Sequence, residues 1–354
     1  MTEQLLDTIK TLTELHGAPG HERLVRDYLL KRLSPLADEV LQDGLGGVFF
    51  VKKSKQDNAK RIMIAAHMDE VGFMVTDITE KGLLKFTEIG GWPADVLQAQ
   101  KMQVLTRDNK TYSGVIGSVP AHFRTGKEAT PQIKDMLLDV GAESKEQVLA
   151  MGIQIGDSIV PAVDFEQLTE NRLLCKAWDN RYGCTIIVDL FEQLKDTDLP
   201  FDLYVGANVQ EEVGLRGAGP SANMIKPDLA FVVDCSPAND TAGSNANGKL
   251  GEGTLVRIID RTMILKPSFK QWLEEIYETN DIQHQYYTSP GGTDGGVIHT
   301  SLQGIPTAVI GVPARYIHSN HTIFDIRDYY AARDGLLALL KNVNDEKIEY
   351  LKMN

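Results

Sequence analysis

Continuous apolar runs bounded by polar residues recur along the chain, at Ile62–Ala66, Phe201–Val209, Leu229–Val233 and Thr307–Val312. Such runs, without alternating polar positions, are typical of strands buried on both faces of a parallel sheet. Before, between and after these runs, apolar residues recur at helical spacing, near residues 5–15, 186–194 and 329–343. The pattern therefore predicts an α/β fold.

A different pattern occupies the stretch from Val71 to Pro161. Short β-like runs are separated there by turn signals such as Gly90-Gly91, and helical spacing is confined to a segment near Lys145–Met151. This pattern predicts a small β-rich domain inserted into the α/β domain. We expect the insertion at residues 69–163 and a catalytic domain formed by residues 1–68 and 164–354.

Side chains that suit metal binding stand beside these apolar runs. Four of the five segments follow a predicted strand and one precedes a helix, and they carry His67, Asp179, the pair Glu211-Glu212, Asp234 and His318. Because the carboxyl ends of parallel strands share one edge of a sheet, these groups predict a common site. For Asp179 alone, an ordinary helix N-cap is the alternative.

The histidines have neighbours and rivals. Asp69 lies two residues after His67, and a metal-bound imidazole commonly donates its other N–H to a carboxylate, so Asp69 is a candidate to orient His67. The alternative is a histidine that is hydrogen-bonded at a strand end. His299 and His321 are rival ligands, and His318 is preferred because it comes first after its strand.

The number of candidate ligands favours two metal ions. One catalytic zinc needs about three protein ligands, whereas here five candidates and a spare carboxylate occur. A carboxylate can bridge two ions, and imidazole with carboxylate suits zinc, cobalt or manganese. Within the pair Glu211-Glu212, one residue can bind metal while the other accepts a proton from water, and the spacing leaves open which does which.

Composition excludes several other functions. The 354 residues carry a net charge of −13, without the basic patches that nucleic-acid binding needs. No stretch is apolar for long enough to span a membrane, and the N-terminus has no signal-peptide pattern. The chain has three cysteines and no CxxC motif, which indicates a reducing compartment. Cys175 and Cys184 stand in apolar surroundings, so we expect them to be buried. We expect a cytoplasmic enzyme.

Taken together, the motifs resemble those of the M42 metallo-aminopeptidases, with the strongest likeness to the glutamyl-specific members. The likeness covers nearly the whole chain in order, and it rests on the segments His67–Phe73, Ala177–Arg181, Asn208–Gly217, Val233–Pro237, Gly291–Asp294 and Ala314–Ser319. Departures from the family pattern, at Gly295–His299, Pro313 and Asn320, touch no expected ligand.

The resemblance implies an α/β/α sandwich with a PDZ-like insertion that forms dimers, which assemble into a tetrahedral homododecamer. It also implies the metal ligands. His67 and Asp234 would hold one divalent ion, Zn²⁺ or Co²⁺, and Glu212 and His318 the other, with Asp179 bridging them.

The resemblance assigns further roles as well. Glu211 would be the general base and Asp69 would orient His67. His122, in the insertion, is a candidate to reach a neighbouring subunit's site, with a plain loop histidine as the alternative.

The expected reaction is hydrolysis of the N-terminal bond of a peptide. A preference for Glu or Asp needs a cation in the side-chain pocket, and Arg257 in a strand-like run is the candidate, with a salt bridge to Asp260 as the alternative. Rival interpretations are a Leu or Lys preference, an N-acyl amino-acid deacylase or a carboxypeptidase with the same metals. A glycosidase and a metal-stabilised assembly protein are weaker, since neither explains both the histidines and a free base.

Overall fold

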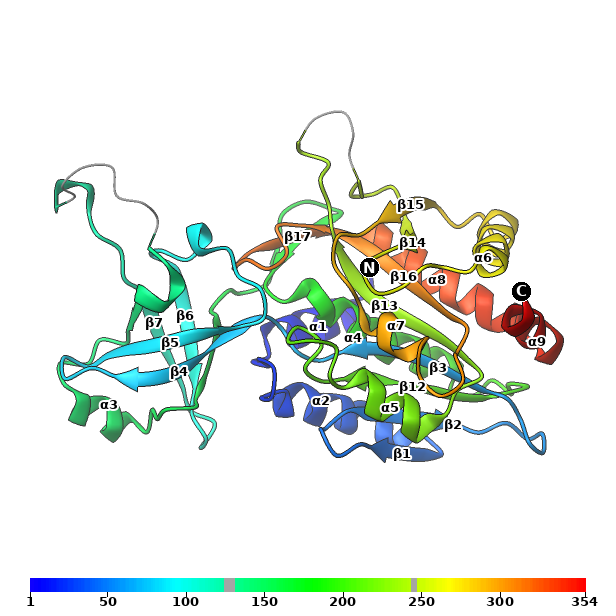
Figure 1. The fold of residues 1–354 in the computed structure, drawn as a ribbon, viewed down its shortest axis with the longest axis horizontal. Helices are drawn as coiled ribbons and strands as arrows, with labels where there is room; N and C mark the ends of the chain where they lie inside the picture. Colours follow the sequence, from blue (N-terminus) through cyan, green and yellow to red (C-terminus); the bar gives the residue numbers. More distant parts are fainter. Residues whose placement is uncertain (124–130, 243–246) are drawn as a thin grey trace.

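The computed structural model describes residues 1–123, 131–242 and 247–354. Figure 1 shows two bodies side by side, a large sheet covered by helices and a smaller β-structure. The large sheet has 11 strands within the described residues. Its main path runs in the order β1 (Glu39–Gln42), β2 (Val48–Lys52), β12 (Asp202–Asn208), β3 (Arg61–His67), β13 (Leu229–Pro237), β16 (Thr307–Arg315), β17 (Thr322–Asp325), β11 (Arg172–Cys175) and β10 (Glu166–Gln167).

Two further strands extend the sheet beside β16, namely β14 (Thr254–Ile259) and β15 (His284–Thr288). The four central strands β12, β3, β13 and β16 are mutually parallel. They are the four strands that the apolar runs predict. β13 is longer than expected, reaching Pro237, because it pairs with β16 as far as Ala314. Asp234 therefore lies within a strand and not after it.

Helices cover both faces of this sheet, as an α/β/α sandwich requires. They are α1 (Glu3–Glu14), α2 (Arg23–Leu33), α4 (Trp178–Leu194), α5 (Ala218–Ile225), α6 (Pro267–Thr279), α7 (Asp294–Ile298), α8 (Ile326–Asn342) and α9 (Asp345–Met353). Strand β3 shows the layering. Its Ile62 and Ile64 join a core with α1, α4 and α8, whereas Met63 and Ala65 join a second core with α5 and α7.

The smaller body is a closed β-barrel in residues 72–161. Its strands follow the order β4 (Gly72–Ile78), β5 (Leu83–Ile89), β8 (Leu137–Asp139), β7 (Thr111–Ile116), β6 (Lys101–Leu105) and β9 (Ser158–Pro161). The predicted helix is α3 (Lys145–Met151), and the barrel has its own apolar core. The expected fold class, α/β with a small β-rich insertion, is confirmed. Strand β8 is the barrel strand that the sequence pattern does not predict, and in the large sheet β10, β11, β15 and β17 lie outside the predicted runs.

Short 3-10 turns complete the described structure, at η1 (Ser34–Leu36), η2 (Ala94–Val96), η3 (Ala121–Phe123) and η4 (Ile133–Asp135). Within the described ranges, no helix combines the length and apolarity that crossing a bilayer requires. All three cysteines are buried and free, as the apolar surroundings of Cys175 and Cys184 predict.

Candidate metal centre

The expected site residues meet at the carboxyl edge of the parallel strands. Parallel pairing puts Asn208 of β12 opposite His67 at the end of β3, and the chain then turns into Glu211 and Glu212. Asp234 lies on β13, the neighbour of β3 on its other side. His318 follows β16 after two residues. Parallel strand order therefore gathers residues from four segments at one edge.

Helix α4 is the fifth segment of the site and brings Asp179 into the same space. The backbone of Asp179 and Asn180 is non-helical, and the helix after them is capped by Asn180, whose Oδ1 accepts a hydrogen bond from Gly183 N at 3.1 Å. The N-cap alternative for Asp179 is therefore wrong. Close packing of α4 makes this approach possible. A Cβ at Gly183 would lie 2.7 Å from the Ala66 Cβ, so only glycine fits there.

Asp179 faces both histidines. Its Oδ1 lies 3.4 Å from His67 Nε2, and its Oδ2 lies 3.5 Å from His318 Nε2. Asp234 Oδ1 is 3.6 Å from His67 Nε2, and Glu212 Oε2 is 3.3 Å from His318 Nε2. Two candidate ligand groups thus share Asp179, and a third group joins His67 with Glu211 and Glu212; in each group the ligand atoms lie within 4.8 Å of one another.

Unpaired polar atoms in these groups fit bound cations. Asp179 Oδ1 and Glu212 Oε1 are buried and have no hydrogen-bond partner among the described residues. Buried carboxylates without partners are costly, and coordination of a metal ion is one of the few ways to offset that cost. Imidazole and carboxylate are also the ligands that zinc and cobalt accept. The residues present therefore fit bound divalent cations.

The electrostatics show the same need for positive charge. Burial raises the pKa of Glu212 to about 8, and nearby Asp179 adds to the shift although His318 opposes it. Burial also raises the pKa of Glu211 well above its usual range. Burial lowers the pKa of His318, but the carboxylates of Glu212 and Asp179 outweigh it and bring that pKa to about 9.

The two histidine rings are oriented through their second nitrogens. His67 Nδ1 lies 3.1 Å from the Asp69 carbonyl oxygen and 3.4 Å from Asp69 Oδ1. The backbone of Gly91, which follows barrel strand β5, lies beside the His318 ring and helps to raise its pKa. In both cases the Nε2 atom is left to face the carboxylates. The barrel therefore helps to shape the centre that it adjoins.

Asp69 makes closer contacts with the glutamate pair than with His67. Its Oδ1 accepts a hydrogen bond from Glu211 N, and its Oδ2 accepts one from Glu212 N, each at 3.0 Å. Asp69 is fully buried. Its carboxylate therefore fixes the backbone that carries both glutamates, a contact that the sequence does not predict.

Arg257 lies beside the centre, in the wall of a cavity of about 410 Å³ that also contacts Glu211, Asp234 and His318. It is buried, and its Nη1 lies 3.3 Å from Asp260 Oδ2 while Nη2 donates to Ser236 Oγ at 2.6 Å. The salt bridge to Asp260 is thus present. The Nε atom of Arg257 is buried and has no partner in the described part of the chain.

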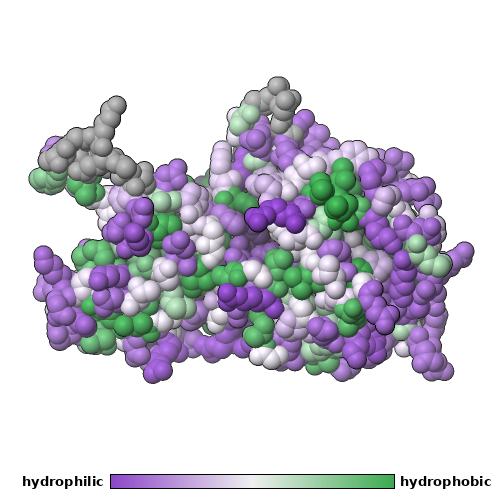
Figure 2. Space-filling model, viewed as in Figure 1, coloured by the Kyte–Doolittle hydropathy of each residue, from purple (hydrophilic) through white to green (hydrophobic). Residues whose placement is uncertain are grey.

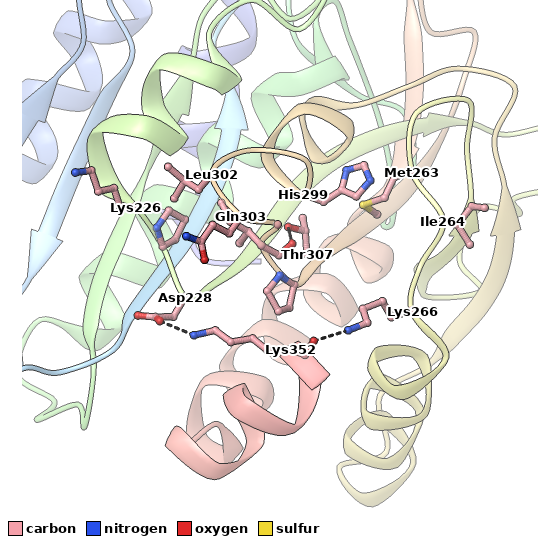
Figure 3. Close-up of a pocket in the computed structure, with 14 residues that line it drawn as sticks. Lys226, Asp228, Met263, Ile264, Lys266, His299, Leu302, Gln303, Thr307 and Lys352 are labelled. Atoms are coloured by element: carbon pink, nitrogen blue, oxygen red, sulfur yellow. Dashed lines mark hydrogen bonds and ion pairs between the residues drawn. The ribbon is translucent and has the colours of Figure 1, made fainter. Parts of the chain in front are cut away.

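The remaining candidates lie elsewhere. His122 is exposed on η3 of the insertion and belongs to none of the ligand groups. His321 is also exposed. His299 lines a separate cavity of about 620 Å³, where Figure 3 shows it above the ion pair of Lys352 with Asp228. That cavity contacts the amino ends of β13 and β16. It therefore lies at the opposite edge of the sheet from the candidate metal centre, which stands at the carboxyl ends.

A buried ion network behind the centre escapes sequence analysis. Lys176 Nζ lies 2.6 Å from Glu70 Oε1, and Arg181 Nη2 lies 3.1 Å from the same oxygen. Arg181 also donates to the carbonyl of Met68. The network therefore holds the loop after β3 in place. In the sequence, it is indicated only by the charged residues that stand beside Asp69 and Asp179.

Several known proteins with related sequences are named as aminopeptidases. Residues 46–334 match the family model described as M42 glutamyl aminopeptidase. The glutamyl aminopeptidase of Lactococcus lactis subsp. cremoris is 44% identical over 99% of both chains. The lysyl aminopeptidase of Pyrococcus furiosus is 34% identical over 96% of both chains.

Solved structures agree with this relationship. A TET aminopeptidase from a marine sediment archaeon of the Thaumarchaeota has a TM-score of 0.94 at 34% identity, covering 99% of this chain and 100% of its own. The TET1 peptidase of Pyrococcus horikoshii has a TM-score of 0.87 at 28% identity, covering 96% of this chain and 100% of its own. Fold and site together define an aminopeptidase-type hydrolase. The chain belongs to the M42 glutamyl aminopeptidase family.

Proposed function

We propose that this protein is a dinuclear metallo-aminopeptidase with a preference for N-terminal Glu or Asp. The observation that carries the proposal is the shared position of Asp179, whose two oxygens face His67 and His318 separately. His67 and Asp234 would hold one Zn²⁺ or Co²⁺, and Glu212 and His318 the second. When bound, such ions would lower the pKa of an attacking water and polarise the scissile carbonyl.

Glu211 is the residue that we assign as general base. Its Oε2 lies 3.9 Å from His67 Nε2, and it lines the cavity next to the ligand groups. A carboxylate in that position can accept a proton from the attacking water and pass it to the leaving amine. Asp69 would act as a positioning residue, because it holds the Glu211 backbone and faces the His67 ring.

The preference for acidic residues rests on Arg257. Arg257 lines the cavity wall, so its guanidinium is the cation available there to pair with a substrate carboxylate. Asp260 neutralises part of the charge, but its Oδ1 already accepts bonds from Thr262 and Met263. The glutamyl-specific relative from Lactococcus supports this preference, and the lysyl-specific relative from Pyrococcus supports the rival.

The test is initial rates on Glu-, Asp-, Leu- and Lys-p-nitroanilide, with metal-free protein and with added zinc, cobalt or manganese. We expect metal-dependent cleavage that is fastest for the Glu and Asp substrates. Faster cleavage of the Leu or Lys substrate would keep the reaction and overturn the assignment of Arg257. No cleavage of any substrate with two ions bound would overturn the aminopeptidase assignment for this chain.

We expect Arg257→Met to lower kcat/KM on Glu-p-nitroanilide by about 10- to 100-fold, since a hydrogen bond to a charged group contributes roughly 1.5–3 kcal/mol. Activity on Leu-p-nitroanilide should change little. Arg172→Met is the matched control, because it breaks the pair of Arg172 on β11 with Asp325 at the end of β17; it should leave kcat/KM on both substrates unchanged. An equal loss on both substrates would show that Arg257 does not select the side chain.

We also propose that the protein is a homo-oligomer built through its barrel. The related TET1 peptidase forms a tetrahedron or a large octahedral shell. Figure 2 shows hydrophobic residues at the surface of the barrel. The exposed hydrophobic residues of the barrel include Val115, Leu149 and Ile155. Light scattering should give about 470 kDa if twelve 39.2 kDa chains assemble. A mass near one chain at micromolar concentration would contradict the proposal.

A further inference from the structure

The turn that carries the two glutamates begins with an unusual backbone conformation. Gln210 follows β12 and has φ of 56°, in the left-handed region that residues other than glycine rarely adopt. Such a conformation persists only where the surrounding structure holds it. Because Glu211 and Glu212 come next, whatever holds Gln210 also sets where both carboxylates point.

The side chain of Glu22 contacts this residue from a distant part of the chain. Its Oε1 accepts a hydrogen bond from Gln210 N at 3.1 Å and a second one from Gly20 N at 2.7 Å. Glu22 is only 6% exposed and does not use its side chain to cap α2. It lines none of the cavities described above.

Glu22 and Asp69 together hold three successive amides. Gln210 N donates to Glu22, while Glu211 N and Glu212 N donate to the two oxygens of Asp69. The carboxylates come from two loops, before α2 and after β3, so the turn is fixed from two sides. Without Glu22, the Gln210 amide would lose its acceptor and the strained turn would be held at one end only.

We propose that Glu22 is a positioning residue that fixes the Gln210–Glu212 turn and thereby the direction of the Glu211 carboxylate. Its catalytic consequence rests on the proposed function of Glu211. The backbone consequence does not, because it concerns hydrogen bonds of the protein without metal or substrate.

The test compares Glu22→Ala with Glu22→Gln by hydrogen–deuterium exchange and by steady-state kinetics. Glu22→Ala should speed exchange at residues 210–212 and lower kcat by about 10- to 100-fold, with KM and metal content near the wild-type values. Glu22→Gln keeps an oxygen acceptor, so it should restore both readouts. Burial and the Asp69 carboxylate raise the pKa of Glu22 to about 7, so an uncharged side chain suits the site.

Asp328→Ala is the matched control. Asp328 is likewise a buried carboxylate that accepts two backbone N–H bonds, from Gly251 and Gly253, and its burial likewise raises its pKa to about 7. Its loss should lower the thermal midpoint and leave both exchange at residues 210–212 and kcat unchanged.

Three results separate the possible failures. Wild-type exchange at residues 210–212 in Glu22→Ala would overturn the proposal, and so would a Glu22→Gln variant as impaired as Glu22→Ala. Faster exchange with an unchanged kcat would overturn the catalytic consequence for Glu22. If the wild type cleaves no substrate, the proposed function fails, while the exchange experiment still decides whether Glu22 holds the turn.

Discussion

Glu211→Gln is expected to lose at least 10²- to 10⁴-fold in kcat while it keeps its fold and both metal ions, because proton transfer by a positioned base contributes about that much. Glutamine has nearly the shape of glutamate but cannot accept the proton of the attacking water. The backbone bond from residue 211 to Asp69 does not involve the side chain, so the turn should stay in place. Stopped assays with Glu-p-nitroanilide and metal analysis of the purified variant check both parts.

The neighbouring variant Glu212→Gln is the control for this experiment. Glu212 Oε2 lies closer to His318 Nε2 than Glu211 Oε2 lies to His67 Nε2, at 3.3 Å against 3.9 Å. We therefore expect Glu212→Gln to lose metal as well as activity. If Glu212→Gln kept two ions and Glu211→Gln lost one, the roles of the two residues would have to be exchanged.

Much of the fold is predictable because its signals are local. The four central strands are continuous apolar runs, and burial on both faces of the sheet explains why they carry no alternation. Strand β8 has three residues and pairs only within the barrel, so its short sequence holds too little pattern. The length of β13 is set by its pairing with β16, which its own residues do not encode.

The candidate ligand residues are brought together for a similar reason, since each stands in or next to an element that the pattern already marks. The residues that hold these ligands in place are not predictable from the sequence. Glu22 meets Gln210, and Asp69 meets Glu211, across 188 and 142 residues of chain. Nothing near Glu22 in the sequence distinguishes a buried acceptor of backbone bonds from a surface carboxylate. Such contacts form only when folding brings the loops before α2, after β3 and after β12 together at the carboxyl edge of the sheet.

Asp179→Asn tests the idea that one carboxylate serves both metal ions. Each oxygen of Asp179 faces a different histidine, and an amide nitrogen carries two protons and cannot bind a cation. We expect the variant to retain fewer than two ions per chain, to bind them more weakly, and to lose activity by about 10³-fold or more, since a dinuclear centre works as a unit. Calorimetric titration of metal-free protein with Zn²⁺ or Co²⁺, with metal analysis by mass spectrometry, measures this.

Asp189→Asn provides the matched control because it makes the same change on the same helix, far from the centre. Asp189 pairs with Arg333 and accepts from Tyr329, so its loss should affect stability and leave metal binding unchanged. Two ions bound as tightly in Asp179→Asn as in the wild type would refute the shared ligand. Loss of one ion with normal binding of the other would place Asp179 in a single site. The ion that remains would then need another ligand in place of Asp179, from outside the two groups that share this residue.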